Sequence, residues 1–359
     1  MESIKKRISS KNWVFWGKVS LVLFVSISWV LIFVDFNLLF NNKYQSLWIH
    51  SPSTVEEGEE FKFTIEAWDE FERLAGSFEG EIEFELVSYN VTETGYKEIQ
   101  SPVWSLKSDD NTFSSNFVWA GIFPAYQFKG ADNGQKEFSM QISTPGIHYI
   151  QATDKETGDV FLSNPIVVHN KGSNYNHLYW GDIHAHSTQS DGSGTFRDNY
   201  KFARDVAKLD FAALTDHSEM FPQFGQETLL NNFQKYIETT NEFNEDGKFT
   251  TLVALEWTPL LPQQRSYLCN QHTNLYFSGN DMPFFSTFTH FTPYELYKYI
   301  EENTDDDFIG WTHHVMRSDY SSGIYTSKLD RFHILKALKT RSAYATNWIN
   351  RHYIDFTIN

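Results

Sequence analysis

Cysteine is almost absent from this chain of 359 residues, which contains only Cys269. A single cysteine excludes an intrachain disulfide framework and a cysteine-based zinc site, so any metal must be bound by histidine, aspartate or glutamate. Basic residues are also scarce, with 29 Lys and Arg against 46 Asp and Glu and a net charge of −17. Because nucleic-acid binding relies on basic side chains that neutralise phosphates, we expect no nucleic-acid partner. The chain is long enough for two folded units.

A long uncharged run lies near the N-terminus, from Val19 to Val34. Basic residues precede it, and apolar and aromatic residues on both sides extend it towards the roughly 20 residues that cross a bilayer. The alternative, a cleaved signal peptide, lacks a small-residue cleavage site after the run. We therefore predict a cytoplasmic basic tail and a single-pass transmembrane anchor over residues 1–42. The positive-inside rule then places the folded domains outside the cytoplasm, in the periplasm or the extracellular space.

Short runs of alternating apolar and polar residues follow, as in EEFKFTIEAW and GEIEFELVSY. In the first run Phe61, Phe63 and Ile65 share one face, with polar residues between them, which is typical of a half-buried strand. Turn residues separate the runs. We therefore predict an Ig-like β-sandwich domain over residues 43–170. The alternative is that these strands only cover the domain that follows.

The period of the pattern changes after the polar linker HNKGSNYNH. Strand-like LYWGDIHAH, FAALTDH and FTTLVALEW are separated by helical patterns over residues 195–208 and 228–244. HTNLYF and DFIGWTHH read as further strands, with a helix that begins after Thr292 between them. Alternation of strand and helix predicts an α/β fold with a parallel sheet, and the repeat length favours a β/α barrel over residues 177–359.

Potential metal ligands collect where these predicted strands end. His184 and His186 lie two residues apart, so both imidazoles point to one side of a strand and can bind one ion. Asp191 follows on a glycine-containing turn, and Glu256 can bridge two ions with its two oxygens. In a barrel these strand ends share one mouth, where active sites form. A metal site at this mouth is therefore the prediction.

Other residues complete this predicted site. A second ion would be bound by His217, His272 and one of His313 and His314. Asp182 and Asp216 lie beside ligand positions and can accept the other N–H of an imidazole, so we group them with His217, a possible proton donor, as catalytic residues. Each motif alone has an ordinary explanation, such as a helix N-cap at Asp216 or a strand-end charge at Glu256. Their coincidence at successive strand ends favours the metal site.

The motifs GDIHAHSTQSDGSGT, LDFAALTDH, LVALEWT, NQHTNLYF and IGWTHH occur in this order between Leu178 and His314. This ordered set resembles a PHP (polymerase and histidinol phosphatase) domain, in a branch where a β-sandwich precedes the catalytic domain. The resemblance implies a distorted β/α barrel that holds two or three Zn, Mn or Fe ions and acts as a phosphoesterase. It implies the metal ligands His184, His186, Asp191, His217, Glu256, His272 and His313 or His314. The family closes its site with an Asp-x-His that is missing after His314, so the resemblance also implies a C-terminally truncated barrel.

These features together predict a membrane-anchored, metal-dependent hydrolase. Its substrate would be a small-molecule or glycan-linked phosphoester, attacked by a metal-activated water. One alternative is an amidohydrolase-type barrel, which also opens with His-x-His but needs a lysine ligand that no predicted strand end carries. The other is a non-catalytic cell-surface binding module, in which the sandwich recognises a ligand and the barrel is a degenerate scaffold.

Overall fold

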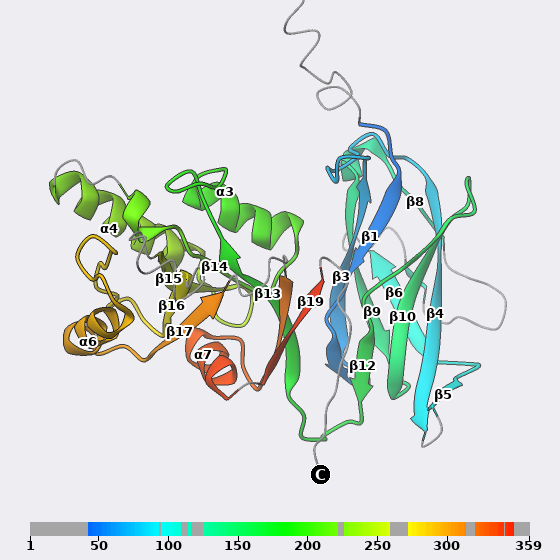
Figure 1. Ribbon diagram of the computed structural model, residues 1–359. Coiled ribbons are helices and arrows are strands. Elements are labelled where there is room, and N and C mark those ends of the chain that lie inside the picture. Colours follow the sequence, from blue (N-terminus) through cyan, green and yellow to red (C-terminus); the bar gives the residue numbers. More distant parts are fainter. Residues whose placement is uncertain are drawn as a thin grey trace, which may run out of the picture.

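The structure is a computed structural model that describes residues 42–92, 95–108, 114–115, 125–221, 226–258, 272–313, 320–340 and 342–347. Figure 1 shows two β-rich units side by side, one built from the first half of the described chain and one from the second. The α-helices of the described residues all belong to the second unit. Each unit has its own buried core.

The first unit is a β-sandwich, so the alternating pattern predicted this unit correctly. One sheet has the strand order β1-β3-β9-β6-β7, and the other has the order β2-β12-β10-β4-β5 with β11 on β10 and β8 on β4. The strands are β1 (Ser46–His50), β2 (Thr54–Glu56), β3 (Glu60–Trp68), β4 (Glu81–Thr92), β5 (Gly95–Glu98), β6 (Trp104–Ser108), β7 (Ser114–Ser115), β8 (Ala125–Gln127), β9 (Gln135–Ile142), β10 (Gly146–Asp154), β11 (Val160–Leu162) and β12 (Ile166–His169). A single 3-10 turn, η1 (Gly130–Asp132), precedes β9.

Alternate side chains of both sheets fill the core between the two layers. Phe63 of β3 is buried and stacks on Phe138 of β9, with ring centroids 5.4 Å apart. Phe84 of β4, on the opposite sheet, meets Phe138 edge-on at 5.1 Å. Burial of these rings removes apolar surface from water and holds the two sheets together.

The second unit is built on a sheet with the order β17-β16-β15-β14-β13-β18-β19. Its strands are β13 (His177–Ala185), β14 (Phe211–Leu214), β15 (Thr250–Trp257), β16 (His272–Phe277), β17 (Phe308–His313), β18 (Tyr320–Thr326) and β19 (Ala343–Asn347). Its helices are α3 (Phe196–Lys201), which continues as the π-helical turn η2 (Phe202–Val206), the 3-10 turn η3 (Ser218–Met220), α4 (Gln226–Phe243), α6 (Pro293–Asn303) and α7 (Arg331–Lys339). Capping boxes begin α3 at Thr195 and α6 at Thr292, and the sequence predicted a helix at both places.

The predicted β/α barrel is wrong. In this sheet only the β13–β14 and β14–β15 pairings are parallel, whereas β16, β17, β18 and β19 join by antiparallel pairing. Among the described strands β17 and β19 end the sheet and do not pair with each other, so the sheet is open and mixed. A closed parallel barrel needs every strand to return in the same direction through a crossover. Alternation of strand and helix in the sequence does not reveal the direction in which a later strand joins.

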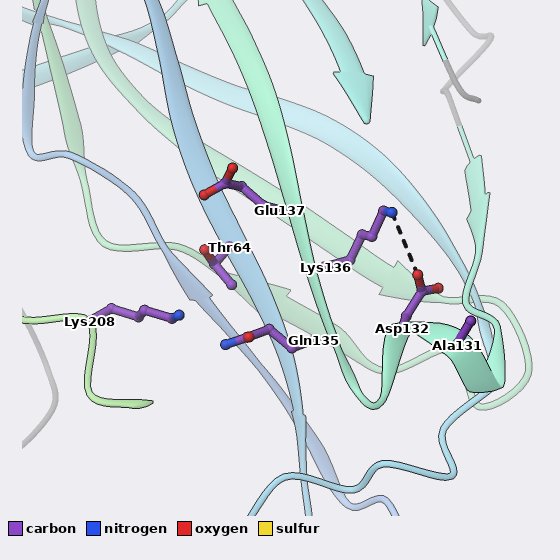
Figure 2. Close-up of a pocket in the computed structure, with 7 residues that line it drawn as sticks. All are labelled: Thr64, Ala131, Asp132, Gln135, Lys136, Glu137 and Lys208. Atoms are coloured by element: carbon purple, nitrogen blue, oxygen red, sulfur yellow. Dashed lines mark ion pairs between the residues drawn. The ribbon is translucent and has the colours of Figure 1, made fainter. Parts of the chain in front are cut away.

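Buried contacts connect the two units. Trp180 of β13 donates its indole N–H to Ser53 Oγ at 2.7 Å, and the backbone N–H of Leu178 donates to Thr54 Oγ1 at 3.1 Å. Lys208, which follows η2, lies 3.9 Å from the buried carboxylate of Glu66 in β3. Figure 2 shows Lys208 opposite the start of β9 in the sandwich. These contacts fix the start of β13 against the sandwich.

The predicted membrane anchor receives no support from the structure. The predicted segment, residues 1–42, lies outside the described part of the chain except for Asn42. Over the residues that are described, no helix combines the length and the apolar character needed to cross a membrane. The predicted single-pass anchor and the extracytoplasmic location derived from it are therefore withdrawn.

Candidate metal centre

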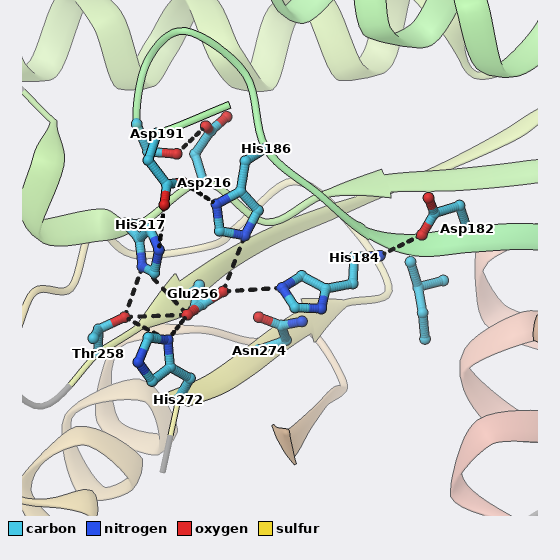
Figure 3. Close-up of polar contacts among 12 residues, drawn as sticks. Asp182, His184, His186, Asp191, Asp216, His217, Glu256, Thr258, His272 and Asn274 are labelled. Carbon is cyan, nitrogen blue, oxygen red and sulfur yellow. Dashed lines mark hydrogen bonds and ion pairs between the residues drawn. The ribbon is translucent and has the colours of Figure 1, made fainter. Parts of the chain in front are cut away.

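Four histidines that were predicted as ligands surround the carboxylate of Glu256 (Figure 3). His184 lies on β13 and His186 just after it, while His217 follows β14 and His272 begins β16. Glu256 lies near the end of β15, which neighbours both β14 and β16. Beyond the end of β14, a parallel backbone bridge pairs His217 with Glu256, so these two residues lie side by side. Strand order therefore brings together residues that are far apart in the sequence.

Each oxygen of Glu256 faces two imidazole rings. Oε2 lies 3.3 Å from His184 Nε2 and 3.2 Å from His186 Nε2. Oε1 lies 3.2 Å from His217 Nδ1 and also contacts His272 Nδ1. The Glu256 side chain is fully buried, so a negative charge there needs close positive partners.

A tight loop after β13 carries Asp191 to the far side of two of these rings. Asp191 Oδ1 lies 2.7 Å from His186 Nδ1, and Oδ2 lies 3.7 Å from His217 Nε2. The loop passes so close to the preceding backbone that a Cβ on Gly192 would lie 2.0 Å from the carbonyl oxygen of His186. Only glycine permits this approach. The Ser-Asp-Gly turn thus folds its carboxylate back over the site, as the sequence predicts.

Asp216 and Asp182, predicted as catalytic residues that orient imidazoles, hold backbone and hydroxyl groups. Asp216 is fully buried and accepts hydrogen bonds from the Ser187 amide and hydroxyl, each at 2.8 Å, and from Ser190 Oγ at 2.5 Å. Asp182 Oδ1 accepts from the backbone N–H of His184 at 2.9 Å. Both carboxylates therefore position the chain on either side of the ligands. Their predicted catalytic role, like that of His217, stays a prediction.

His313 and His314 were predicted as further ligands. β17 ends at His313, which lies opposite His272 in the antiparallel register. The His313 side chain and the whole of His314 lie outside the described part of the structure. The structure therefore does not test these two ligands.

Three residues of the site were missed by the sequence analysis, namely Glu219, Thr258 and Asn274. Glu219 Oε1 lies 3.4 Å from His217 Nδ1, and the side chain is almost fully buried. Thr258 Oγ1 lies 2.7 Å from His217 Nδ1 and donates to Glu256 Oε1 at 3.2 Å. Glu219 and Thr258 each follow a ligand by two residues, the same spacing as His184 and His186, and this spacing was the available signal.

The acidic side chains shift the protonation of the site. Burial by itself lowers the pKa of His186, but the hydrogen bonds and charges of Glu256 and Asp191 outweigh it and raise this pKa to about 9. At His217 burial dominates, and the pKa is lowered. Burial raises the pKa of Glu219 to about 7, and the nearby charge of Glu256 adds to this. A divalent cation would compete with the protons that these groups hold.

The residues present fit a metal centre. Among the described residues, three groups offer ligand atoms that all lie within 4.8 Å of one another: His184, His186 and Glu256; His186, Asp191 and His217; and His217, Glu256 and His272. Two ligands at about 2.1 Å from one tetrahedral ion are about 3.4 Å apart, close to the separations of 3.2 and 3.3 Å around Glu256. Asn274 Oδ1 and Glu219 Oε2 are buried, with no hydrogen-bond partner among the described residues. Such atoms cost about 1–3 kcal/mol each unless a ligand satisfies them.

Residues 222–332 match the model of a family described as a protein of unknown function, DUF3604. This segment contains Glu256 and His272. It begins after His184, His186 and His217, which therefore lie outside the match. Relatives described as uncharacterized proteins are 25% identical in Chlamydia muridarum and 26% identical in Chlamydia trachomatis serovar D, over 216 residues each. Each match covers 60% of this chain and 29% of the relative. The chain therefore spans about three tenths of the length of the curated relatives it matches.

Three solved structures show a weak likeness to this chain. The D00-D0 domain of intimin is 12% identical, with a TM-score of 0.22, over 35% of this chain and 48% of its own. Domains 5-6 of the S-layer protein SbsC are 9% identical, with a TM-score of 0.22, over 42% of this chain and 58% of their own. A β-glucuronidase of Parabacteroides merdae is 12% identical, with a TM-score of 0.17, over 59% of this chain and 23% of its own. TM-scores this low do not establish a shared fold, and no function follows from them.

The predicted phosphoesterase activity is corrected as well. The phosphoesterase prediction assumed that the strand ends meet at the mouth of a closed barrel. The sheet of the described residues is open, so this assumption is wrong. The matching family and the curated relatives have no described activity that would replace that premise. The description of the chain as a membrane hydrolase is therefore withdrawn, together with the amidohydrolase alternative, which needs a barrel too. The resemblance to PHP domains is not tested by these matches and stays a prediction.

Proposed function

We propose that this chain is a binding protein whose second unit holds two divalent transition-metal ions, one at each oxygen of Glu256. The observation that carries this proposal is the arrangement of four imidazoles around one buried carboxylate, two at each oxygen. Zn, Mn and Fe all accept imidazole nitrogen and carboxylate oxygen as ligands. Of the functions predicted from the sequence, the proposal develops the binding module.

The three candidate ligand groups divide naturally into two ions. The group of His184 and His186 and the group of His217 and His272 share only Glu256. A carboxylate can bind one ion through each oxygen, which makes Glu256 a bridge between neighbouring ions. The third group uses the opposite nitrogens of His186 and His217, which face Asp191. We therefore assign Asp191 to orienting these two rings, as carboxylates behind metal-binding histidines commonly do.

The bound ions would also stabilise the fold of the second unit. The ligands come from β13, β15 and β16 and from the turn after β14, so two ions would tie four separate segments together. A buried carboxylate surrounded by imidazoles has an alternative without metal, in which protonated histidine balances the charge of Glu256. The two possibilities differ in metal content and in the response of stability to metal.

Elemental analysis of the purified chain, after dialysis against a weak chelator, distinguishes them. We expect two transition-metal ions per chain, loss of one ion in His184→Ala, and loss of one in His272→Ala. His333→Ala is the matched control, because His333 of α7 pairs with the N-cap residue Asp330 and is not part of the cluster. A folded wild-type chain that binds no Zn²⁺, Mn²⁺ or Fe²⁺ would contradict the proposal.

A further inference from the structure

The metal centre has an uneven supply of ligands at its two ends. The ion at His184 and His186 has these two rings and Glu256 Oε2 within reach. The ion at His217 and His272 has two rings and Glu256 Oε1 within reach, and Glu219, which no sequence motif assigned, lies beside His217. The two ends therefore differ by one carboxylate.

The position of Glu219 is set by a single turn of 3-10 helix. η3 begins directly after His217, and the Met220 backbone N–H donates to the His217 carbonyl at 3.0 Å. This turn directs Met220 outwards, where it is 48% exposed, while Glu219 points inwards and is 9% exposed. A glutamate is seldom buried without a partner that satisfies its charge.

The carboxylate of Glu219 lies beside one proposed ligand, His217, and just outside the group of His217, Glu256 and His272 whose ligand atoms all lie within 4.8 Å of one another. Its Oε1 is 3.4 Å from His217 Nδ1, the same nitrogen that lies 3.2 Å from Glu256 Oε1. Both separations are those of two ligands around one tetrahedral ion, about 3.4 Å. The other oxygen, Oε2, is buried and has no hydrogen-bond partner among the described residues. Thr258 and a backbone N–H already donate hydrogen bonds to this carboxylate, and a cation beside His217 would satisfy the oxygen that they leave without a partner.

We propose that Glu219 is the fourth protein ligand of the ion held by His217, His272 and Glu256. This inference rests on the proposed metal-binding function. The ion would have a closed shell of two nitrogens and two oxygens, which is typical of structural sites. The ion at His184 and His186 has three protein ligands and keeps a position open to an external ligand, an oxygen anion or water. The closed end binds its ion more tightly and fills first.

The test is a Zn²⁺ titration of the full chain in competition with a chromophoric chelator. Wild type is expected to bind two ions with different affinities. Glu219→Gln, which keeps the size of the side chain and removes its charge, is expected to weaken the tighter ion at least tenfold and to leave the other unchanged. Glu66→Gln is the matched control, because Glu66 is a fully buried carboxylate in the sandwich. It is expected to retain both affinities.

The outcomes separate this inference from the function beneath it. A wild-type chain that binds no ion would refute both. A wild type with two ions, together with a Glu219→Gln variant that keeps both affinities, would refute only the role of Glu219. If Glu219→Gln does not fold, Glu219→Asp is tested instead. This variant shortens the side chain by one methylene and so moves the carboxylate oxygen away from the ion. An unchanged tighter affinity in Glu219→Asp would overturn the proposal, and a weakened one would support it.

Discussion

A fully buried histidine in the sandwich and a partly buried histidine in the second unit have opposite surroundings. In the sandwich, His148 is fully buried, donates to the Thr144 carbonyl at 2.7 Å and accepts from Ser88 Oγ at 2.7 Å. Burial lowers its pKa to about 4. In the second unit, His186 lies between Glu256 and Asp191, and its pKa is raised to about 9 in spite of burial.

Burial lowers the pKa of both histidines, and the partners decide the opposite outcomes. Neutral partners leave the buried imidazole of His148 uncharged, and both of its nitrogens are satisfied by the protein. The carboxylates beside His186 favour a positive charge at this imidazole, which either a proton or a bound metal ion can supply. A buried histidine with neutral partners therefore supports the fold, whereas a buried histidine among carboxylates marks a site for a cation.

The largest effect is expected from the two buried glutamates, one in each unit. Glu256→Gln removes the carboxylate shared by both proposed ions, so metal affinity should fall more than about 100-fold, beyond what the loss of an outer partner causes. Glu66→Gln in the sandwich should leave metal content unchanged and lower the free energy of unfolding, because His50 and Lys208 lose their acidic partner. Elemental analysis and urea unfolding measure the two effects. Equal metal content in both variants would remove the distinction between the units.

Acid should weaken the fold through His148. Its pKa is about 4 in the folded chain and about 6.5 in the unfolded chain, so the unfolded state binds the extra proton as pH falls below 6.5. The contribution to stability is complete above pH 6.5 and decreases down to about pH 4. The difference between these two pKa values corresponds to roughly 3 kcal/mol in the free energy of unfolding. Urea unfolding of wild type and His148→Gln at pH 7 and pH 4.5 should show a smaller pH effect in the variant, and parallel pH effects would contradict this origin.

An effect of intermediate size is expected from two buried aspartates, one in each unit, that accept hydrogen bonds from a turn or loop next to a strand. Asp216→Asn weakens the bonds to Ser187 and Ser190, so the loop that carries Asp191 should loosen, with a loss of about 1–3 kcal/mol in the free energy of unfolding. Asp154→Asn weakens a similar bond to the Glu156 backbone in the sandwich, and a comparable loss is expected. Only Asp216→Asn should also weaken Zn²⁺ binding. Reduced binding in both variants would show that general stability, and not loop position, controls the site.

The smallest effects concern the helix caps of the second unit. Thr195→Ala and Thr292→Ala each remove a side chain that accepts a hydrogen bond from the first helical turn, and each should cost about 1 kcal/mol. Thr195 directly follows the Asp191 loop, so its variant should reduce Zn²⁺ affinity slightly, whereas Thr292→Ala should not. Thermal unfolding and Zn²⁺ titration of the two variants test this difference. A larger loss of Zn²⁺ affinity in Thr292→Ala than in Thr195→Ala would contradict this expectation.

Local features of the sequence predicted most of the elements correctly. The alternating face of Phe61, Phe63 and Ile65 predicted β3, because a strand buries every second side chain. The run LYWGDIHAH predicted β13 to within one residue at each end, and Thr292 predicted the start of α6. These patterns depend on neighbours in the chain, so they can be recognised without knowledge of the rest of the fold.

Two kinds of feature were not predicted, and both depend on distant parts of the chain. The antiparallel direction of β16 against β15 is set by packing, and it turned the expected barrel into an open sheet. The inward direction of Glu219 is set by one turn of η3, and the bonds of Asp216 to Ser187 and Ser190 depend on how the loop folds over β14. Sequence spacing gives residue types near a site but not the direction in which each side chain points.

The sequence by itself determined the chemistry available to this protein. With Cys269 as the single thiol and with His184, His186, His217, Glu256 and His272 at strand ends, any transition metal must be held by imidazole and carboxylate. The tertiary structure decided which of these groups meet, because the order β16-β15-β14-β13 places four strand ends around one buried carboxylate. It also decided the difference between His148 and His186. Hydrogen-bond partners that arrive from distant strands determine whether a buried imidazole is neutral or charged.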